Sequence, residues 1–114
     1  MQELINIFQT RLYKLMKELA ERNGSDLHLT GNSIPFFRIQ GQMIPADNES
    51  FSEDQLLMEL KQLIGNTKIE RFLESKDFDC SFGLEGIARF RINLFFERGN
   101  IACVMRALNN QIPT

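Results

Sequence analysis

The sequence contains no tryptophan, one tyrosine and one histidine, and each scarcity narrows what the chain can do. Ten phenylalanines supply nearly all of its aromatic surface, and rings without a polar group usually fill a core. A zinc site needs several converging donors, but His28 has no second histidine and no nearby cysteine to join it. We therefore expect no metal site.

Cysteines and long apolar runs are equally scarce. The only two cysteines, Cys80 and Cys103, have a spacing that fits neither a zinc knuckle nor a redox pair. Both lie in alternating apolar segments, so we expect them to be small buried hydrophobic residues. The sequence has no signal peptide and no apolar run near the ~18 residues of a membrane-spanning helix. A cytoplasmic location without a membrane span is therefore expected.

Strong charge of one sign is also absent. A formal net charge of −2 gives no field that would attract nucleic acid or an anionic membrane, so no direct nucleic-acid partner is expected. The glycines nowhere form the GxxxxGK pattern of a phosphate-binding loop. We therefore expect this chain alone to be no enzyme and to hold no cofactor of its own.

The residues that are present predict a single domain, because 114 residues is near the common domain size. Residues 2–22 carry apolar side chains at helical spacing, including Leu4 and Phe8, and are predicted to form an amphipathic helix. Asn23 and Gly24 follow the last apolar turn, where a left-handed residue can close a helix.

Beyond that point the apolar period changes to two, which is typical of strands. Residues 26–30 are predicted to form a first strand with Asp26, His28 and Thr30 on one face. Residues 35–39 and 42–44 flank Gly41 and predict a short hairpin.

Two helices are predicted next. Ser52 with Gln55 has the spacing of a capping box, and the helix that follows should end near residue 65. Thr67 with Glu70 repeats that spacing and predicts a third, shorter helix that ends within residues 74–77.

The last third of the sequence predicts three longer strands. Residues 77–82 alternate between polar and apolar, residues 83–86 form a turn, and residues 88–96 alternate again. Arg98 and Gly99 turn the chain into residues 101–108. The whole pattern predicts an α+β domain: a mostly antiparallel sheet of about six strands with helices on one face and the other face open.

Three groups of side chains could carry chemistry. His28 could move a proton, but a histidine hydrogen-bonded to a neighbour is the more ordinary interpretation, and we favour it. Asp77 and Asp79 share a strand face and could act as a carboxylate pair, although a solvated acidic edge is the more ordinary interpretation.

Arginines form the third group. Arg89 and Arg91 share one strand face, Arg106 lies in the strand predicted to pair with it, and Arg98 lies in the connecting turn. The four guanidinium groups could converge, and their rigid forks of donors suit phosphate or carboxylate. Surface ion pairs with Asp77, Asp79, Glu85 or Glu97 are an equally open interpretation at this point.

Several of these residues fall in an ordered set. The set comprises SDLHL at residues 25–29, Pro35, Arg38, Gly41, residues 77–82, RFRIN at residues 89–93, Arg98 with Gly99, and Arg106. In order and spacing it resembles the N-terminal domain of the type IV pilus retraction, or PilT-type, ATPases of the type II and type IV secretion ATPase superfamily.

The resemblance implies a PAS-like fold over residues 1–109, with residues 110–114 beginning a linker to a RecA-like ATPase domain. It also implies a parent protein that is an ATPase using ATP and magnesium and assembling as a homo-hexamer. In such a ring this domain packs on the ATPase domains of its own and the neighbouring subunit. The implied location is the cytoplasmic face of the inner membrane, with the pilus or secretion machinery as partner.

By motif position, Arg89, Arg91 and Arg106 are the candidates for contacting nucleotide held by the ATPase domain. Arg98 is a weaker candidate, because Glu97 precedes it where the family commonly has glutamine. The resemblance further implies that Asp26, His28 and Arg38 lie at the interface between domains.

A second function class stays open. A free-standing PAS-like sensor or adaptor could bind a small ligand among the phenylalanines or a protein partner along the open sheet face. An internal cavity would favour that alternative, whereas a filled core with an exposed arginine face would favour the motor domain.

Overall fold

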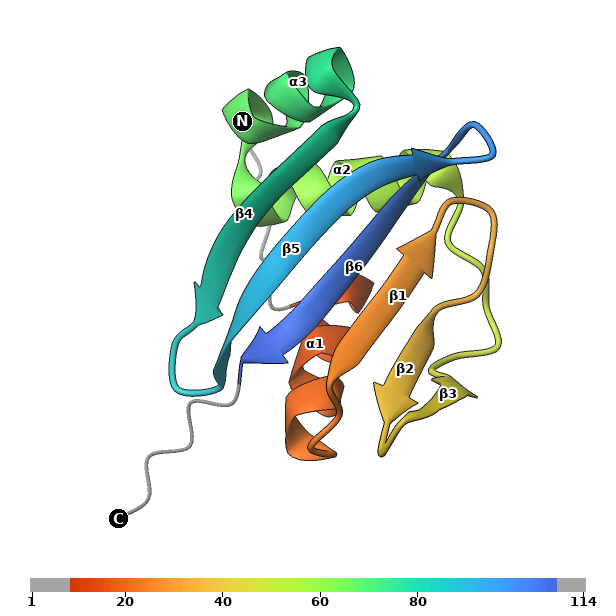
Figure 1. Cartoon of the computed structure of the whole chain (residues 1–114), viewed down its shortest axis with the longest axis vertical. Coiled ribbons are helices and arrows are strands. Elements are labelled where there is room, and N and C mark those ends of the chain that lie inside the picture. The colour runs from red at the N-terminus through yellow and green to blue at the C-terminus, as the bar shows by residue number, and fades with distance from the viewer. Residues whose placement is uncertain (1–8, 109–114) are drawn as a thin grey trace.

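The six strands form one sheet in the order β3-β2-β1-β6-β5-β4, with every neighbouring pair antiparallel (Figure 1). The computed structural model describes residues 9–108. The helices and strands are α1 Arg11–Glu21, β1 Asp26–Thr30, β2 Phe36–Ile39, β3 Gln42–Pro45, α2 Glu53–Ile64, α3 Asn66–Ser75, β4 Asp77–Leu84, β5 Ala88–Glu97 and β6 Asn100–Leu108.

The helices gather on one face of this sheet. Figure 1 shows α1 and α2 behind it. The buried leucines of these helices belong to one core cluster with the inward residues of the strands. Phe37 and Phe90 are fully buried in that layer, and Phe72 of α3 stacks on Phe96 of β5 with ring centroids 5.0 Å apart. The predicted α+β class, with one covered and one open sheet face, is confirmed. Within residues 9–108 none of the helices has the length and apolar composition needed to cross a membrane.

The first helix is shorter than predicted at its start. Thr10 has extended backbone dihedrals, and its side chain accepts a hydrogen bond from the backbone N–H of Tyr13, so α1 begins at Arg11. Leu4 and Phe8 lie outside the described residues. At the other end Asn23, with a φ of 56°, takes the left-handed conformation that closes the turn.

The two middle helices meet at a single glycine. Ser52 caps α2 by accepting from the N–H of Gln55 at 3.0 Å, as predicted. The predicted cap at Thr67 is wrong, because α3 begins at Asn66. Gly65 ends one helix and precedes the next with a φ of 96°, a conformation that suits glycine.

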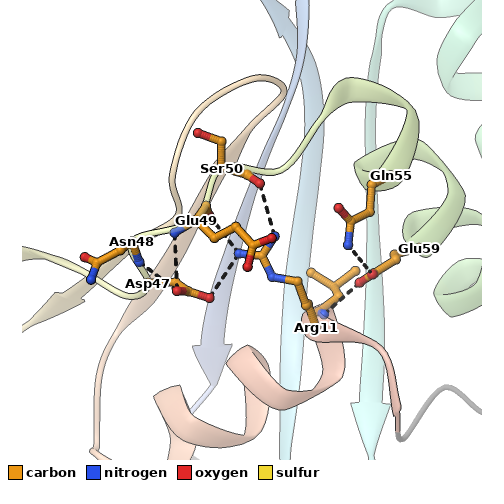
Figure 2. Close-up of polar contacts among 8 residues, drawn as sticks. Arg11, Asp47, Asn48, Glu49, Ser50, Gln55 and Glu59 are labelled. Carbon is orange, nitrogen blue, oxygen red and sulfur yellow. Dashed lines mark hydrogen bonds and ion pairs between the residues drawn. The ribbon is translucent and has the colours of Figure 1, made fainter.

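The side chain of Arg11 joins α1 to the segment that leads into α2 (Figure 2). Its guanidinium donates to the carbonyl of Glu49 at 2.8 Å, to the carbonyl of Ser50 at 3.2 Å and to Asp47 Oδ2 at 3.1 Å. It also lies 4.0 Å from the ring centroid of the buried Phe51. These contacts fix the crossing from the β2–β3 hairpin to the helical layer.

The predicted strands are present, with shifts of one residue at an end of β2, β3, β5 and β6 and a larger shift at the end of β4. β4 continues through Gly83 and Leu84, so the turn occupies residues 85–87 rather than 83–86. Cys103 is fully buried as expected, but Cys80 is only half-buried because it lies on the edge strand. Burial raises the pKa of both thiols.

Candidate functional site on the open face of the sheet

A row of charged side chains crosses the open face of the sheet. The strand register places one residue from each of five neighbouring strands side by side. In order across the sheet they are Arg38 of β2, Asp26 of β1, Arg106 of β6, Arg91 of β5 and Ser81 of β4. Their neighbours in each strand face the core, because side chains alternate along a strand. The row therefore brings together residues from five strands that the sequence keeps far apart.

Asp26 is the centre of charge in this row, and its side chain is 7% exposed. Its carboxylate accepts from Arg106 Nε at 3.1 Å and from Ser25 Oγ at 2.8 Å, and Arg38 Nε lies 3.9 Å away. The Arg106 side chain remains 69% exposed. Asp26 thus orients Arg106 and offsets part of its charge without covering it.

Arg91 and Arg89 have no such counter-charge. Within residues 9–108 neither guanidinium makes a hydrogen bond or an ion pair. Arg91 is the direct cross-strand partner of Arg106, and like charges in that relation repel. Arg89 lies two residues earlier on the same face, with Nη1 3.6 Å from where a Cβ of Gly83 would be. This surface therefore favours an anion.

Arg98 does not belong to the cluster. It lies in the turn after β5, with a φ of 53°, at the far end of the strand from Arg89. Seven residues of extended chain separate it from Arg91, which is roughly 23 Å. The expectation that all four arginines converge is therefore wrong for Arg98.

A second row, one step along the strands, supplies polar and apolar groups. Asn93 Nδ2 donates to Asp79 Oδ1 at 2.8 Å and to Asp77 Oδ1 at 3.2 Å. Asn93 was not among the site residues predicted from the sequence, although its polar side chain on the arginine face of β5 is the signal for it. A hollow of about 440 Å³ covers both rows and is lined by Asp79, Arg91, Ile92, Asn93, Phe95, Val104 and Arg106.

His28 lies in the same second row, between Phe36 and Val104. Its Nε2 atom is buried and has no hydrogen-bond partner among the described residues. Burial lowers the pKa of His28, the positive charge of Arg38 lowers it further, and the negative charge of Asp26 opposes both. The imidazole is therefore neutral at neutral pH.

No group of three His, Cys, Asp or Glu side chains within residues 9–108 is arranged to hold a metal ion.

Known proteins similar to this chain include ATPases of type IV pili. A scan against models of protein families found no match. The type IV pilus ATPases PilU and PilT of Pseudomonas aeruginosa are 27% and 26% identical to it over 101 residues, which is 89% of the chain in each case. The crystal structure of the pilus retraction motor PilT with bound ADP superposes over 97% of the chain with a TM-score of 0.76 and 30% identity. The chain is a homologue of the N-terminal domain of PilT-type ATPases.

The PilT-type fold extends to a more distant structure. The ATPase DotB of Legionella pneumophila matches 90% of the chain with a TM-score of 0.75 and 19% identity, which supports the fold alone. The chain spans 26% and 29% of the lengths of PilU and PilT, and 31% of the solved PilT chain. The homology therefore concerns one domain of much longer proteins.

Proposed function

We propose that this chain is the N-terminal regulatory and oligomerisation domain of a hexameric type IV pilus or type II secretion motor ATPase. It packs on the RecA-like ATPase domains of its own and the neighbouring subunit, and that parent binds ATP with magnesium. Residues 1–109 form the domain and residues 110–114 begin the linker. The assembled motor lies at the cytoplasmic face of the inner membrane, against the pilus or secretion machinery. The homology to PilT and PilU supports this proposal.

One observation carries the arginine part of the proposal: Arg91 and Arg106 are direct cross-strand partners on an exposed face, with Arg89 beside them. Neither Arg89 nor Arg91 makes an ion pair within residues 9–108. A guanidinium supplied from outside a nucleotide site can stabilise the charge that develops on a transferred phosphoryl group, which is worth roughly 10³- to 10⁵-fold in rate. We assign that role to Arg91 and Arg89.

Arg106 has a different part in the same proposal. Arg106 Nε donates a hydrogen bond to Asp26 Oδ1 at 3.1 Å, which holds the side chain in place. Arg106 therefore presents its remaining donors to the phosphates. Asp26 and Arg38 continue the row toward β2, and His28 lies in the second row, two residues after Asp26 on β1. We assign all three to the contact with an ATPase domain. A contact that covers this end of the row would give the unpartnered Nε2 of His28 a polar neighbour.

The test joins this chain to a PilT ATPase domain and measures ATP hydrolysis with each arginine replaced in turn. Arg91→Ala should lower kcat about 100-fold or more, because the lost charge acts on the transition state. Arg89→Ala and Arg106→Ala should lower it by smaller factors. Arg98→Ala should have little effect, since that side chain lies at the far end of β5.

Arg71→Ala provides the matched control, because Arg71 is exposed on α3, away from the arginine row. Light scattering on every variant separates loss of assembly from loss of chemistry. Activity that is unchanged in Arg89→Ala, Arg91→Ala and Arg106→Ala, in rings that still assemble, would remove the arginines from the nucleotide site. The chain would then be a packing module of the motor.

Within residues 9–108 the phenylalanines of the core give no support to a small ligand bound among them. Phe37, Phe51, Phe72 and Phe90 are fully buried, and none of them lines the hollow on the open face. The second hollow described, about 310 Å³ between α1 and the β4–β5 turn, is not lined by these rings either.

A further inference from the structure

Among the strands of residues 9–108, β4 lies at one edge of the sheet and pairs on one side only. β4 runs for eight residues, Asp77–Leu84, and contains neither proline nor lysine, the residues that commonly block strand addition. The opposite edge, β3, has four residues and includes Pro45. An edge of this kind is a template for pairing with another strand.

The backbone groups that β4 offers at this edge follow from hydrogen bonds elsewhere in the sheet. The N–H of Ala107 donates to the carbonyl of Ser25 at 2.9 Å, and the N–H of Gly31 donates to the carbonyl of Ile101 at 2.8 Å. Odd-numbered residues of β6 therefore direct their backbone groups to β1. Because the direction alternates along each antiparallel strand, even-numbered residues of β6 direct their backbone groups to β5. The registers then direct odd-numbered residues of β5 to β6, and even-numbered residues of β5 and β4 to each other. The residues of β4 whose backbone groups face outward are Asp77, Asp79, Ser81 and Gly83.

We propose that two copies of this chain pair through β4, antiparallel, about a two-fold axis that passes through Cys80. The two six-stranded sheets then continue into one another, with their helices on the same side. Such an interface is isologous, so each contact occurs twice.

Repulsion between carboxylates disfavours the two neighbouring registers of this pairing. With the axis at Cys80, Asp79 lies opposite Ser81 of the second copy, and Asp77 lies opposite Gly83 of the second copy. Moving the axis to Asp79 would place the two copies' Asp79 side chains against each other, and moving it to Ser81 would place Asp77 opposite Glu85. Like charges directly opposite are destabilising, so the axis at Cys80 is preferred.

The same register brings carboxylates of the second copy toward Arg89 and Arg91, which make no ion pair within residues 9–108. Ser81 is the partner of Arg91 and Gly83 is the partner of Arg89 within one sheet. Across the axis, only Ser81 would separate Arg91 from the second copy's Asp79, and only Gly83 would separate Arg89 from the second copy's Asp77. Two strand spacings are about 9.6 Å, within the combined reach of arginine and aspartate side chains.

Arg89 already leans in the required direction. Its Nη1 lies 3.6 Å from the position a Cβ of Gly83 would occupy, so its guanidinium extends over β4 toward the free edge. On the helical side of the sheet, Phe78, Cys80 and Phe82 are half-buried, and the register sets Phe78 beside Phe82 of the second copy. Pairing would therefore bury aromatic surface on the helical side of the sheet, which favours the dimer.

Sedimentation velocity of the chain alone, over a wide range of concentration, is the first test. The expected result is a monomer that converts to a dimer as concentration rises. A monomer at every concentration would overturn the proposal. No ATPase domain or nucleotide is present, so this result is independent of the proposed motor function.

Oxidation with diamide tests the register. Cys80 lies on the axis as a non-hydrogen-bonded pair, for which Cα atoms are about 4.5 Å apart, within the range of a disulfide. Two Cys80 thiols should therefore join while diamide takes up their two hydrogens. Cys103→Ser should cross-link as the wild type does, and Cys80→Ser should not. A dimer whose Cys80 thiols resist cross-linking would contradict this axis.

A comparison of dimerisation by the Ser81→Pro and Ser81→Ala variants tests the backbone pairing. The N–H of Ser81 faces the free edge, so proline removes a hydrogen bond of the dimer and none of the monomer. Ser81→Pro should abolish dimerisation while circular dichroism stays native, and Ser81→Ala should dimerise normally. Equal dimerisation by two folded variants would place the interface elsewhere.

A charge exchange provides a second test if proline disturbs folding. Asp79→Arg should weaken the dimer about tenfold, since it replaces an attraction to Arg91 by a repulsion at two symmetric places. Arg91→Asp should do the same, and the double variant should restore wild-type dimerisation. Weakening that the double variant fails to reverse would argue against this pairing of charges.

Discussion

Arg106, Arg91 and Arg89 have the same side chain on the same sheet face, yet each has a different environment. Arg106 shares the buried carboxylate of Asp26, Arg91 has no partner within residues 9–108, and Arg89 extends over Gly83. An arginine held by a buried carboxylate loses less side-chain freedom when it binds an anion, because its rotamer is already selected. At this scale the structure divides one predicted cluster into an oriented residue and two with free charge.

The pH dependence of stability should carry a contribution from His28. Its pKa in the folded chain is below the ordinary value of 6.5, so between these two values the unfolded chain binds more protons. The free energy of unfolding should therefore rise with pH through that window. This contribution is fully present above about pH 6.5 and is lost as the pH falls through the folded pKa.

Urea denaturation at about pH 5.5 and about pH 7.5 measures this contribution, with His28→Gln as the matched variant. The variant should show a smaller increase in the free energy of unfolding than the wild type. Asp47, whose pKa is lowered from 3.8 chiefly by the backbone N–H of Asn48, titrates at more acidic pH and does not overlap. An equal increase in wild type and variant would mean that His28 is not the titrating group.

Between elements, the least expected contact is the buried carboxylate of Glu59 at the start of α1. Its side chain accepts from the backbone N–H of Leu12 at 2.8 Å and from Gln55 Nε2 at 3.1 Å (Figure 2). The first N–H groups of a helix have no partner within it, and its N-terminus favours negative charge. Glu59 of α2 therefore caps a helix to which it is not adjacent in sequence.

Replacing Glu59 should destabilise the fold more than its polar character suggests. Glu59→Ala leaves the N–H of Leu12 buried without an acceptor and should cost about 2–4 kcal/mol. Glu59→Gln keeps an acceptor but loses the charge and should cost about half as much. Urea denaturation measures both, with Glu70→Ala on the exposed face of α3 expected within about 0.5 kcal/mol of wild type. A cost for Glu59→Ala as small as that of Glu70→Ala would show that water replaces the carboxylate.

At the scale of the whole molecule, the pairing of β1 with β6 holds the two halves together. β1 and β6 pair along all five residues of β1, from Asp26 with Arg106 to Thr30 with Ala102. The β1–β3 strands precede the helices α2 and α3 in sequence, and the β4–β6 strands follow them. One core lies beneath both groups of strands, so neither group can lose its packing alone.

The chain should therefore unfold in a single cooperative transition. Circular dichroism of the backbone and NMR signals of core methyl groups should give the same denaturation midpoint. Leu27→Ala, which removes buried surface beneath β1, should lower both midpoints together and cost about 2–5 kcal/mol. Signals from β4, β5 and β6 that survive after β1 has unfolded would show two independent units instead.

Much of the fold followed from local patterns. Apolar periods, the turn at Gly41 and the capping pairs of the two middle helices together predicted all nine elements within residues 9–108. The errors lay at boundaries, at Thr10, Thr67 and Gly83, where capping and strand length depend on what packs nearby. The candidate site was predicted in part: the face shared by Arg89 and Arg91 follows from their spacing alone.

The sequence by itself determined the α+β class, the arginine face and the resemblance to PilT-type ATPases, because these depend on residues close together along the chain or on an ordered motif. Only the tertiary structure decided that Asp26 lies beside Arg106 and that, among the strands of residues 9–108, β4 lies at the edge of the sheet. Those features depend on the order and register of strands up to 80 residues apart in sequence. Hydrophobic alternation fixes which face a side chain takes, but it does not specify which strand lies next to it.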